Sequence, residues 1–74
     1  MKTLLILGAG VEQIPAIKTA KQMNLWVVAS DKNPSAPGFK YSDDKILAST
    51  MDSEASLKAA IDYSKRHWIN GVMA

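Results

Sequence analysis

Short apolar runs alternate with amphipathic stretches along the chain. Residues 3–7 (Thr-Leu-Leu-Ile-Leu) and 25–30 (Leu-Trp-Val-Val-Ala-Ser) are almost continuously apolar, as is typical of parallel strands covered on both faces. Between them, residues 11–23 carry apolar side chains at helical spacing, which predicts an amphipathic helix. These three segments predict a strand–helix–strand unit whose two strands run parallel.

The second half of the chain continues this alternation. Residues 45–48 predict a short third strand, residues 49–52 a loop, residues 53–67 a second long helix, and residues 71–74 the start of a fourth strand. One face of the second helix is largely apolar, with its members at spacings of three and four residues. Its members are Leu57, Ala60, Ile61, Ser64 and Trp68.

Turn-forming residues mark the ends of these elements. Asn24 directly follows the first helix. Helices often end with one residue in the left-handed backbone conformation, which asparagine adopts more readily than most residues. Residues 31–38 contain Asn-Pro and Pro-Gly pairs and predict a loop, followed by a short helical turn at 39–42. Asp52 or Ser53 is placed to cap the second helix.

Together the elements predict an α/β fold in three layers, with a parallel sheet of about four strands in the order 3-2-1-4. Ligands of such sheets bind beyond the carboxyl ends of the strands, where the strand order reverses. The length of 74 residues allows one domain at most. Domains rarely end along a buried apolar strand, so we expect residues 1–74 to be the N-terminal fragment of a larger chain.

Composition and charge narrow the class of function. The chain has no cysteine, which argues against a disulfide scaffold and fits a reducing, cytoplasmic compartment. Its basic residues are scattered, so nucleic acid is not an expected partner. No apolar run approaches the ~20 residues of a membrane span. The single histidine, His67, follows Lys65 and Arg66; we expect it to be solvated, and no metal site is predicted.

The strongest candidate site follows the first strand. Gly8 allows a sharp turn off the strand, and Gly10 lets a ligand approach the backbone where no Cβ intervenes. The helix that begins beyond them offers unpaired N–H groups. The pattern predicts a loop that holds a phosphate or carboxylate, although a tight turn without a ligand would have the same glycines. Gln13 replaces the third glycine of the dinucleotide fingerprint, and Glu12 would repel a pyrophosphate.

Polar side chains near this loop allow two interpretations each. Glu12 and Gln13 either contact an amine or hydroxyl of a ligand, or simply lie in the first helical turn. The helix dipole stabilises a carboxylate such as Glu12 at that position. Asp31 ends the second strand and either accepts ribose hydroxyls, as in nicotinamide enzymes, or starts a turn by binding its own backbone. Asn33 lies in the same loop, where turn formation is the main interpretation.

Three segments resemble the N-terminal domain of ATP-grasp ligases, nearest to the carbamoyl-phosphate-synthase-like branch. They are Ile6–Pro15 (ILGAGVEQIP), Asp31–Gly38 (DKNPSAPG) and the pair Asp43-Asp44, and the similarity extends over essentially the whole chain. The resemblance implies a Rossmann-like half-domain that binds no dinucleotide. It also implies that the glycine loop, residues 8–13, contributes to the site of the acceptor substrate.

The same resemblance implies the chemistry of the parent protein, an ATP-dependent carboxylate–amine ligase that acts through an acyl phosphate. ATP and magnesium would bind other domains, so the fragment alone is expected to be non-catalytic and to bind neither. Expected partners are those domains and a small-molecule substrate, and a homo-oligomer is left open. The substrate-binding candidates are Gly8, Ala9, Gly10, Val11, Glu12, Gln13, Asp31 and Asn33.

Two alternatives remain open at this point. The first is an NAD(P)-binding domain of an oxidoreductase, in which Asp31 would bind the ribose. The second is a non-catalytic module of the same fold that senses a small molecule.

Overall fold

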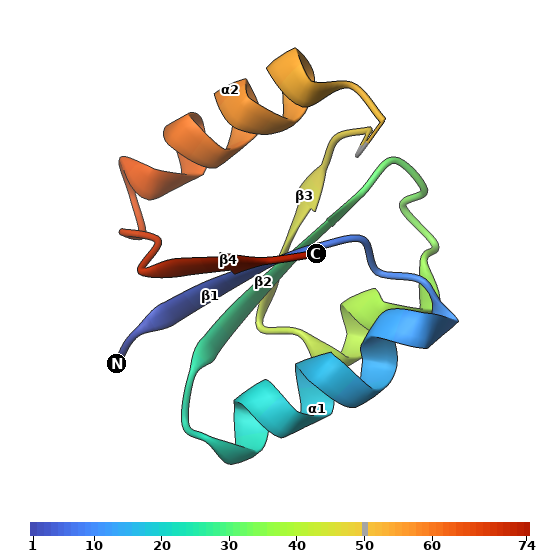
Figure 1. Cartoon of the computed structure of the whole chain (residues 1–74), viewed down its shortest axis with the longest axis vertical. Helices are drawn as coiled ribbons and strands as arrows, with labels where there is room; N and C mark the ends of the chain where they lie inside the picture. Colours follow the sequence, from blue (N-terminus) through green and yellow to red (C-terminus); the bar gives the residue numbers. More distant parts are fainter. Residues whose placement is uncertain (50) are drawn as a thin grey trace.

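A four-stranded parallel sheet in the order β3-β2-β1-β4 forms the centre of the computed structural model, which describes residues 1–49 and 51–74 (Figure 1). The predicted fold class and strand order are confirmed. Thr50, in the loop predicted at 49–52, lies outside the described residues. The strands are β1 (Thr3–Leu7), β2 (Trp26–Asp31), β3 (Asp44–Leu47) and β4 (Gly71–Met73).

Strand β1 lies between β2 and β4. Leu5 of β1 is opposite Val28 of β2 on one side and Val72 of β4 on the other. The first strand has its predicted bounds, the second and third are each shifted by one residue, and the fourth is one residue shorter. In the part of the chain that is described, no helix combines the length and the apolar character needed to cross a membrane.

Helices cover both faces of this sheet, α1 (Ile14–Gln22) on one and α2 (Ser53–Ser64) on the other (Figure 1). The helix predicted at 11–23 is divided, because its first turn is a 3-10 helix, η1 (Val11–Gln13). Pro15 has no N–H to donate to the Val11 carbonyl, and the N–H of Ile14 binds that carbonyl instead. The loop before α1 is therefore more tightly wound than an α-helical start would be.

Two predicted turn residues are confirmed, and one helical turn is displaced. Asn24 has a φ of 61°, in the left-handed region. The Asp52 carboxylate accepts a hydrogen bond of 3.0 Å from the Ala55 N–H and so caps α2. The turn predicted at 39–42 is a 3-10 helix that begins two residues earlier, η2 (Pro37–Tyr41).

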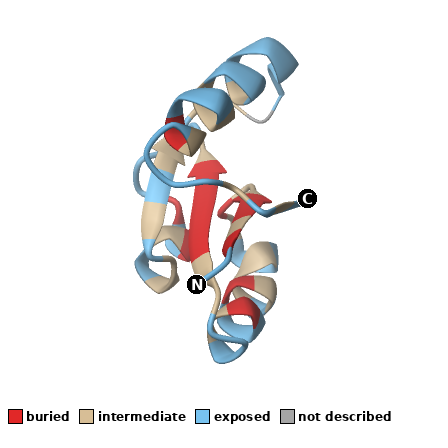
Figure 2. Cartoon of the chain, turned by 90° about the vertical axis from the view of Figure 1, so that its left-hand side faces the viewer, coloured by how far each residue is buried: buried red, intermediate tan, exposed pale blue. Residues whose placement is uncertain are grey.

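The buried residues lie on both faces of the central strands, with more of them towards α1 (Figure 2). On the α1 face, Ile6, Ile17 and Val27 are among the fully buried side chains. On the α2 face, the buried cluster is smaller and consists of Leu5, Val28 and Tyr63. α2 is thus the less firmly packed of the two helices.

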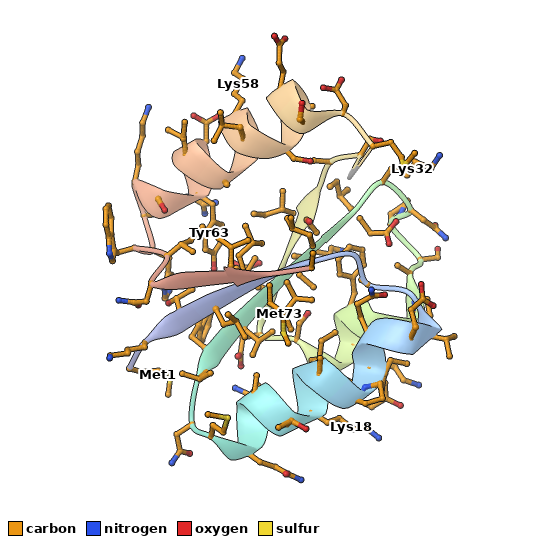
Figure 3. The ribbon with its side chains drawn as sticks, in the orientation of Figure 1. Met1, Lys18, Lys32, Lys58, Tyr63 and Met73 are labelled. Atoms are coloured by element: carbon orange, nitrogen blue, oxygen red, sulfur yellow. The ribbon has the colours of Figure 1, made fainter. Side chains whose placement is uncertain are left out.

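The large apolar side chains on the predicted apolar face of α2 are mostly exposed, while Ala60 and Ser64 of the same face are half-buried. Leu57 is 62% exposed, Ile61 51% and Trp68 74%. Tyr63 is buried instead, at 2% exposure, and its hydroxyl accepts a hydrogen bond of 2.9 Å from the indole N–H of Trp26. Figure 3 shows Tyr63 between α2 and the sheet. This aromatic contact orients α2. Of the apolar stripe, Ala60 packs against the buried cluster of Leu5, Val28 and Tyr63, and Leu57 borders a groove over Leu5 and Leu7 of β1.

The end of α2 also differs from the prediction, because the helix ends at Ser64 and not at His67. The N–H groups of Arg66 and His67 both donate to the Tyr63 carbonyl, which closes the helix in a turn. His67 is exposed, as predicted, but its ring stacks on Trp26 with the ring centroids 4.7 Å apart. This stacking holds the chain after Ser64 against β2, so that it leaves the axis of α2.

Candidate functional site

The glycine loop, residues 8–13, connects the carboxyl end of β1 to α1. Gly8 has a φ of +102°, a conformation that side-chain-bearing residues rarely adopt. Its N–H donates to the Ser30 carbonyl at 2.7 Å, which fixes the start of the loop to β2. The sharp turn predicted at Gly8 is confirmed, and the backbone itself requires glycine there.

Gly10 differs from Gly8 because its backbone has an ordinary conformation. Its φ of −71° and ψ of 176° are extended values that any residue adopts. The atoms nearest to a Cβ built on Gly10 are the carboxylate oxygens of Glu12, at 3.2 Å. These atoms end a flexible side chain, so neither the backbone nor a rigid neighbour requires glycine at position 10.

The side chains of Glu12 and Gln13 fold back over the two glycines. The Glu12 carboxylate lies beside Gly10, and the Gln13 amide lies 3.3 to 3.5 Å from the position of a Cβ on Gly8. Glu12 is exposed and Gln13 is half-buried, with the exposed Val11 preceding them. The structure therefore gathers a carboxylate and an amide over the loop, where they could bind an amine or a hydroxyl.

Ala9, between the two glycines, has no exposed surface and packs in the core on the α1 face. Its N–H donates to a carboxylate oxygen of Asp31 at 3.1 Å, and its carbonyl accepts a bond of 2.7 Å from the N–H of Gly38. Both backbone polar groups of Ala9 thus have partners within the chain. Among the predicted site residues, Ala9 therefore has a side chain that is buried in the core and does not face a ligand.

Asp31 starts a turn by binding the backbone two residues further on, which is one of the two roles predicted for it. One carboxylate oxygen accepts the Asn33 N–H at 3.1 Å, and the other accepts the Ala9 N–H. The Asn33 side chain in turn accepts the N–H of Ser35 at 3.0 Å. The hydrogen bond from Asn33, followed by that from Ala9, lowers the pKa of Asp31 below its usual value of 3.8. Contact of Asp31 or Asn33 with a ligand stays a prediction.

This hydrogen bonding predicts how stability depends on pH. Because the Asp31 pKa is lower in the folded than in the unfolded state, its contribution to stability is fully present above the unfolded pKa. The contribution is lost as the pH falls through the folded value. The free energy of unfolding should therefore fall less steeply below about pH 4 in Asp31→Asn than in the unchanged chain. Urea titrations at pH 6 and pH 3 measure this, and parallel declines in the two proteins would contradict it.

Two structural contributions are not apparent from the sequence. A Cβ on Gly38 would lie 2.8 Å from the Ala9 carbonyl oxygen, so only glycine allows η2 to approach the loop this closely. The signal was the Pro37-Gly38 pair, which is equally typical of an ordinary turn. Asp43 binds the Lys21 ammonium and the Val27 N–H, each at 2.7 Å, and so fastens the start of β3 to its neighbours.

The described residues also show where metal-ligating groups and surface grooves lie relative to the glycine loop. Within residues 1–49 and 51–74, no group of three or more histidine or acidic side chains is placed to hold a metal ion. Four surface grooves of about 300 to 560 Å³ are lined by other segments. The glycine loop lines none of these four grooves.

Comparison with known proteins adds two similarities. A family model described as "PylC-like, N-terminal domain" matches residues 4–74. The crystal structure of N5-carboxyaminoimidazole ribonucleotide synthetase from Thermotoga maritima is similar to this chain, with a TM-score of 0.72 and 29% sequence identity. The similarity covers 84% of this chain but only 17% of that one. A comparison with curated protein sequences finds no match.

Proposed function

The chain belongs to the family of PylC-like N-terminal domains, and we propose that it holds the acceptor substrate of a larger ATP-dependent ligase. The family and the similarity to the synthetase confirm the resemblance to the N-terminal domain of an ATP-grasp ligase.

One observation carries this proposal, namely a glycine at position 10 that the fold itself does not need. Its φ and ψ suit any residue, and the nearest neighbour of a Cβ would be the mobile end of Glu12. Gly10 also precedes η1, whose first N–H groups have no partners within the helix. A missing side chain at this point leaves room for a ligand to reach the backbone.

The groups around Gly10 indicate what such a ligand carries. The N–H groups at the start of η1 favour an anionic group, such as a carboxylate or phosphate. The carboxylate of Glu12 favours a neighbouring amine or hydroxyl and disfavours a bare pyrophosphate. Gln13 can donate or accept a hydrogen bond beside Gly8. These preferences fit a small polar substrate better than a dinucleotide.

The edge of the sheet next to the loop is where the rest of the parent protein would pack. β4 pairs with β1 on one side only, and its Val72 and Met73 are 61% and 45% exposed. Val72 lines an apolar groove of about 490 Å³ with Ile61 and Trp68, while Met73 lines another of about 560 Å³ beside α1. Apolar grooves on both faces of one strand suit additional secondary structure there.

The proposed reaction divides the work between this chain and other domains. A carboxylate attacks the terminal phosphate of ATP, giving an acyl phosphate and ADP. An amine then attacks the acyl carbon, and phosphate leaves with the oxygen that bridged carbon and phosphorus. ATP and magnesium would be bound by the other domains, as in the ligases that this chain resembles. The glycine loop would orient the acceptor substrate for this second step.

Isotope transfer tests the proposed reaction in the full-length protein. With ATP, an amine and a panel of ¹⁸O-labelled carboxylates, the released phosphate should acquire one ¹⁸O atom, because the bridging oxygen leaves with phosphorus. The 74-residue chain alone should release no phosphate above the blank. Phosphate released without the label, in a reaction that still forms the amide, would contradict the acyl-phosphate route.

A nicotinamide-binding role has less support from the described contacts. Gln13 stands over Gly8 where the dinucleotide fingerprint has its third glycine, and Asp31 already binds two backbone N–H groups. No specific contact favours the sensing module over the ligase. The ligase domain is therefore the function that the site supports best.

A further inference from the structure

We propose that Asp31 and Gly38 are positioning residues, which hold the glycine loop in place by binding the backbone of Ala9 from two sides. The loop that contains them, residues 31–38, would then act as a support for the ligand site and not as part of its lining. This inference rests on the proposed function only for what the glycine loop binds.

The first contact joins residues that are 22 positions apart in the sequence. The Ala9 N–H donates to the Asp31 carboxylate at 3.1 Å, and the same carboxylate accepts the Asn33 N–H with its other oxygen. Hydrogen bonds to a charged acceptor are stronger than those between neutral groups. One ionised side chain thus links the glycine loop to the first turn of the second loop.

The second contact binds the carbonyl group of Ala9, whereas the first binds its N–H group. The Gly38 N–H donates to the Ala9 carbonyl at 2.7 Å. A Cβ on Gly38 would lie 2.8 Å from that oxygen and 3.0 Å from the Cδ1 atom of Ile17. η2 can therefore reach the Ala9 carbonyl only because residue 38 has no side chain.

The second loop is braced well enough to serve as a support. The Asn33 side chain accepts the Ser35 N–H, and the Asn33 carbonyl accepts the Ala36 N–H, each at 3.0 Å. Ala36 is 6% exposed and belongs to the same buried cluster as Ala9 and Ile17. Figure 1 shows the loops after β1 and β2 on the same side of the molecule.

A support of this kind matters because Ala9 lies between two glycines. Glycine has the largest backbone freedom, so Gly8 and Gly10 would otherwise sample many conformations. Fixing both peptide groups of Ala9 removes most of that freedom before a ligand binds, which lowers the entropic cost of binding. Asp31 would then influence the ligand through Ala9 and make no direct contact with it.

NMR spectra of the 74-residue chain without any ligand test this role. In Asp31→Ala, the amide signals of Gly8, Gly10 and Val11 should shift or broaden, and the Ala9 amide should exchange with solvent about ten- to a hundredfold faster. Asn33→Ala is the matched control, because it removes a side-chain acceptor from the same loop without touching Ala9. Its effects should be confined to residues 33–36.

Two further variants keep the test decisive if Asp31→Ala does not fold. Asp31→Asn retains one oxygen acceptor and should restore part of the Ala9 protection. Gly38→Ala should shift the Ala9 and Gly10 amide signals as well, because its Cβ would push against the Ala9 carbonyl oxygen. The inference would be overturned if the glycine-loop signals kept their original positions both in Gly38→Ala and in the Asp31 variant that folds. Because no ligand is present, that result would leave the proposed substrate-holding function untouched.

Discussion

Replacing Ile17 with alanine should lower the free energy of unfolding by about 2–5 kcal/mol. The same truncation at Ile61 should change it by less than about 0.5 kcal/mol. Ile17 has no exposed surface and packs from α1 against the sheet, whereas Ile61 is 51% exposed on α2. The two substitutions remove the same atoms, so the difference between them measures how the two helices are packed.

The effect at Ile17 is large compared with the total stability of a chain of this size. At 0.05–0.15 kcal/mol per residue, 74 residues correspond to roughly 4–11 kcal/mol. Loss of the Ile17 side chain removes buried apolar area and leaves a cavity in the larger of the two buried clusters. We therefore expect Ile17→Ala to lose a large part of its total stability and to unfold at a clearly lower urea concentration.

Urea denaturation followed by circular dichroism at 222 nm measures both variants under the same conditions. Equal losses of stability would contradict the structure, because Ile61 would then have to be as buried as Ile17. A small loss at Ile17 would contradict the packing of α1.

The strands and their order could be predicted because the signals are local. Continuous apolar runs identify buried parallel strands, and the spacing between them requires helical crossovers. Gly8 could be identified for the same reason, since a strand followed at once by glycine indicates a sharp turn. These features depend on neighbouring residues and little on the rest of the molecule.

The orientation of α2 could not be predicted because it depends on distant partners. Helical spacing reveals an apolar stripe but not which element covers it. In the structure, Tyr63 fills the interface and accepts the hydrogen bond of Trp26, while Ile61 of the apolar stripe stays exposed. His67 stacks on Trp26, a residue of another element, which no local pattern at the helix end indicates.

The candidate site was only partly predictable for a related reason. The glycines are visible in the sequence, but the two roles of Asp31 differ only in what lies beside its carboxylate. The Ala9 N–H that it binds is 22 positions away, and the need for glycine at position 38 arises from the Ala9 carbonyl. Both facts depend on how two loops meet in space.

Substituting Gly10 with valine should impair the full-length enzyme while leaving this domain folded. The extended backbone at Gly10 accommodates a β-branched residue, and the Glu12 side chain can move aside, so stability should change by less than about 1 kcal/mol. The added methyl groups would fill the space through which a ligand reaches the backbone. We expect the KM for the acceptor substrate to rise about tenfold or more, a loss of about 1.4 kcal/mol of binding free energy.

Steady-state kinetics of full-length Gly10→Val, with the acceptor substrate and ATP varied separately, tests the central claim most directly. The account predicts a raised KM for the acceptor substrate and a KM for ATP within about twofold of the original value, because ATP would bind other domains. A raised KM for ATP with an unchanged KM for the acceptor substrate would contradict the claim that the glycine loop holds the acceptor.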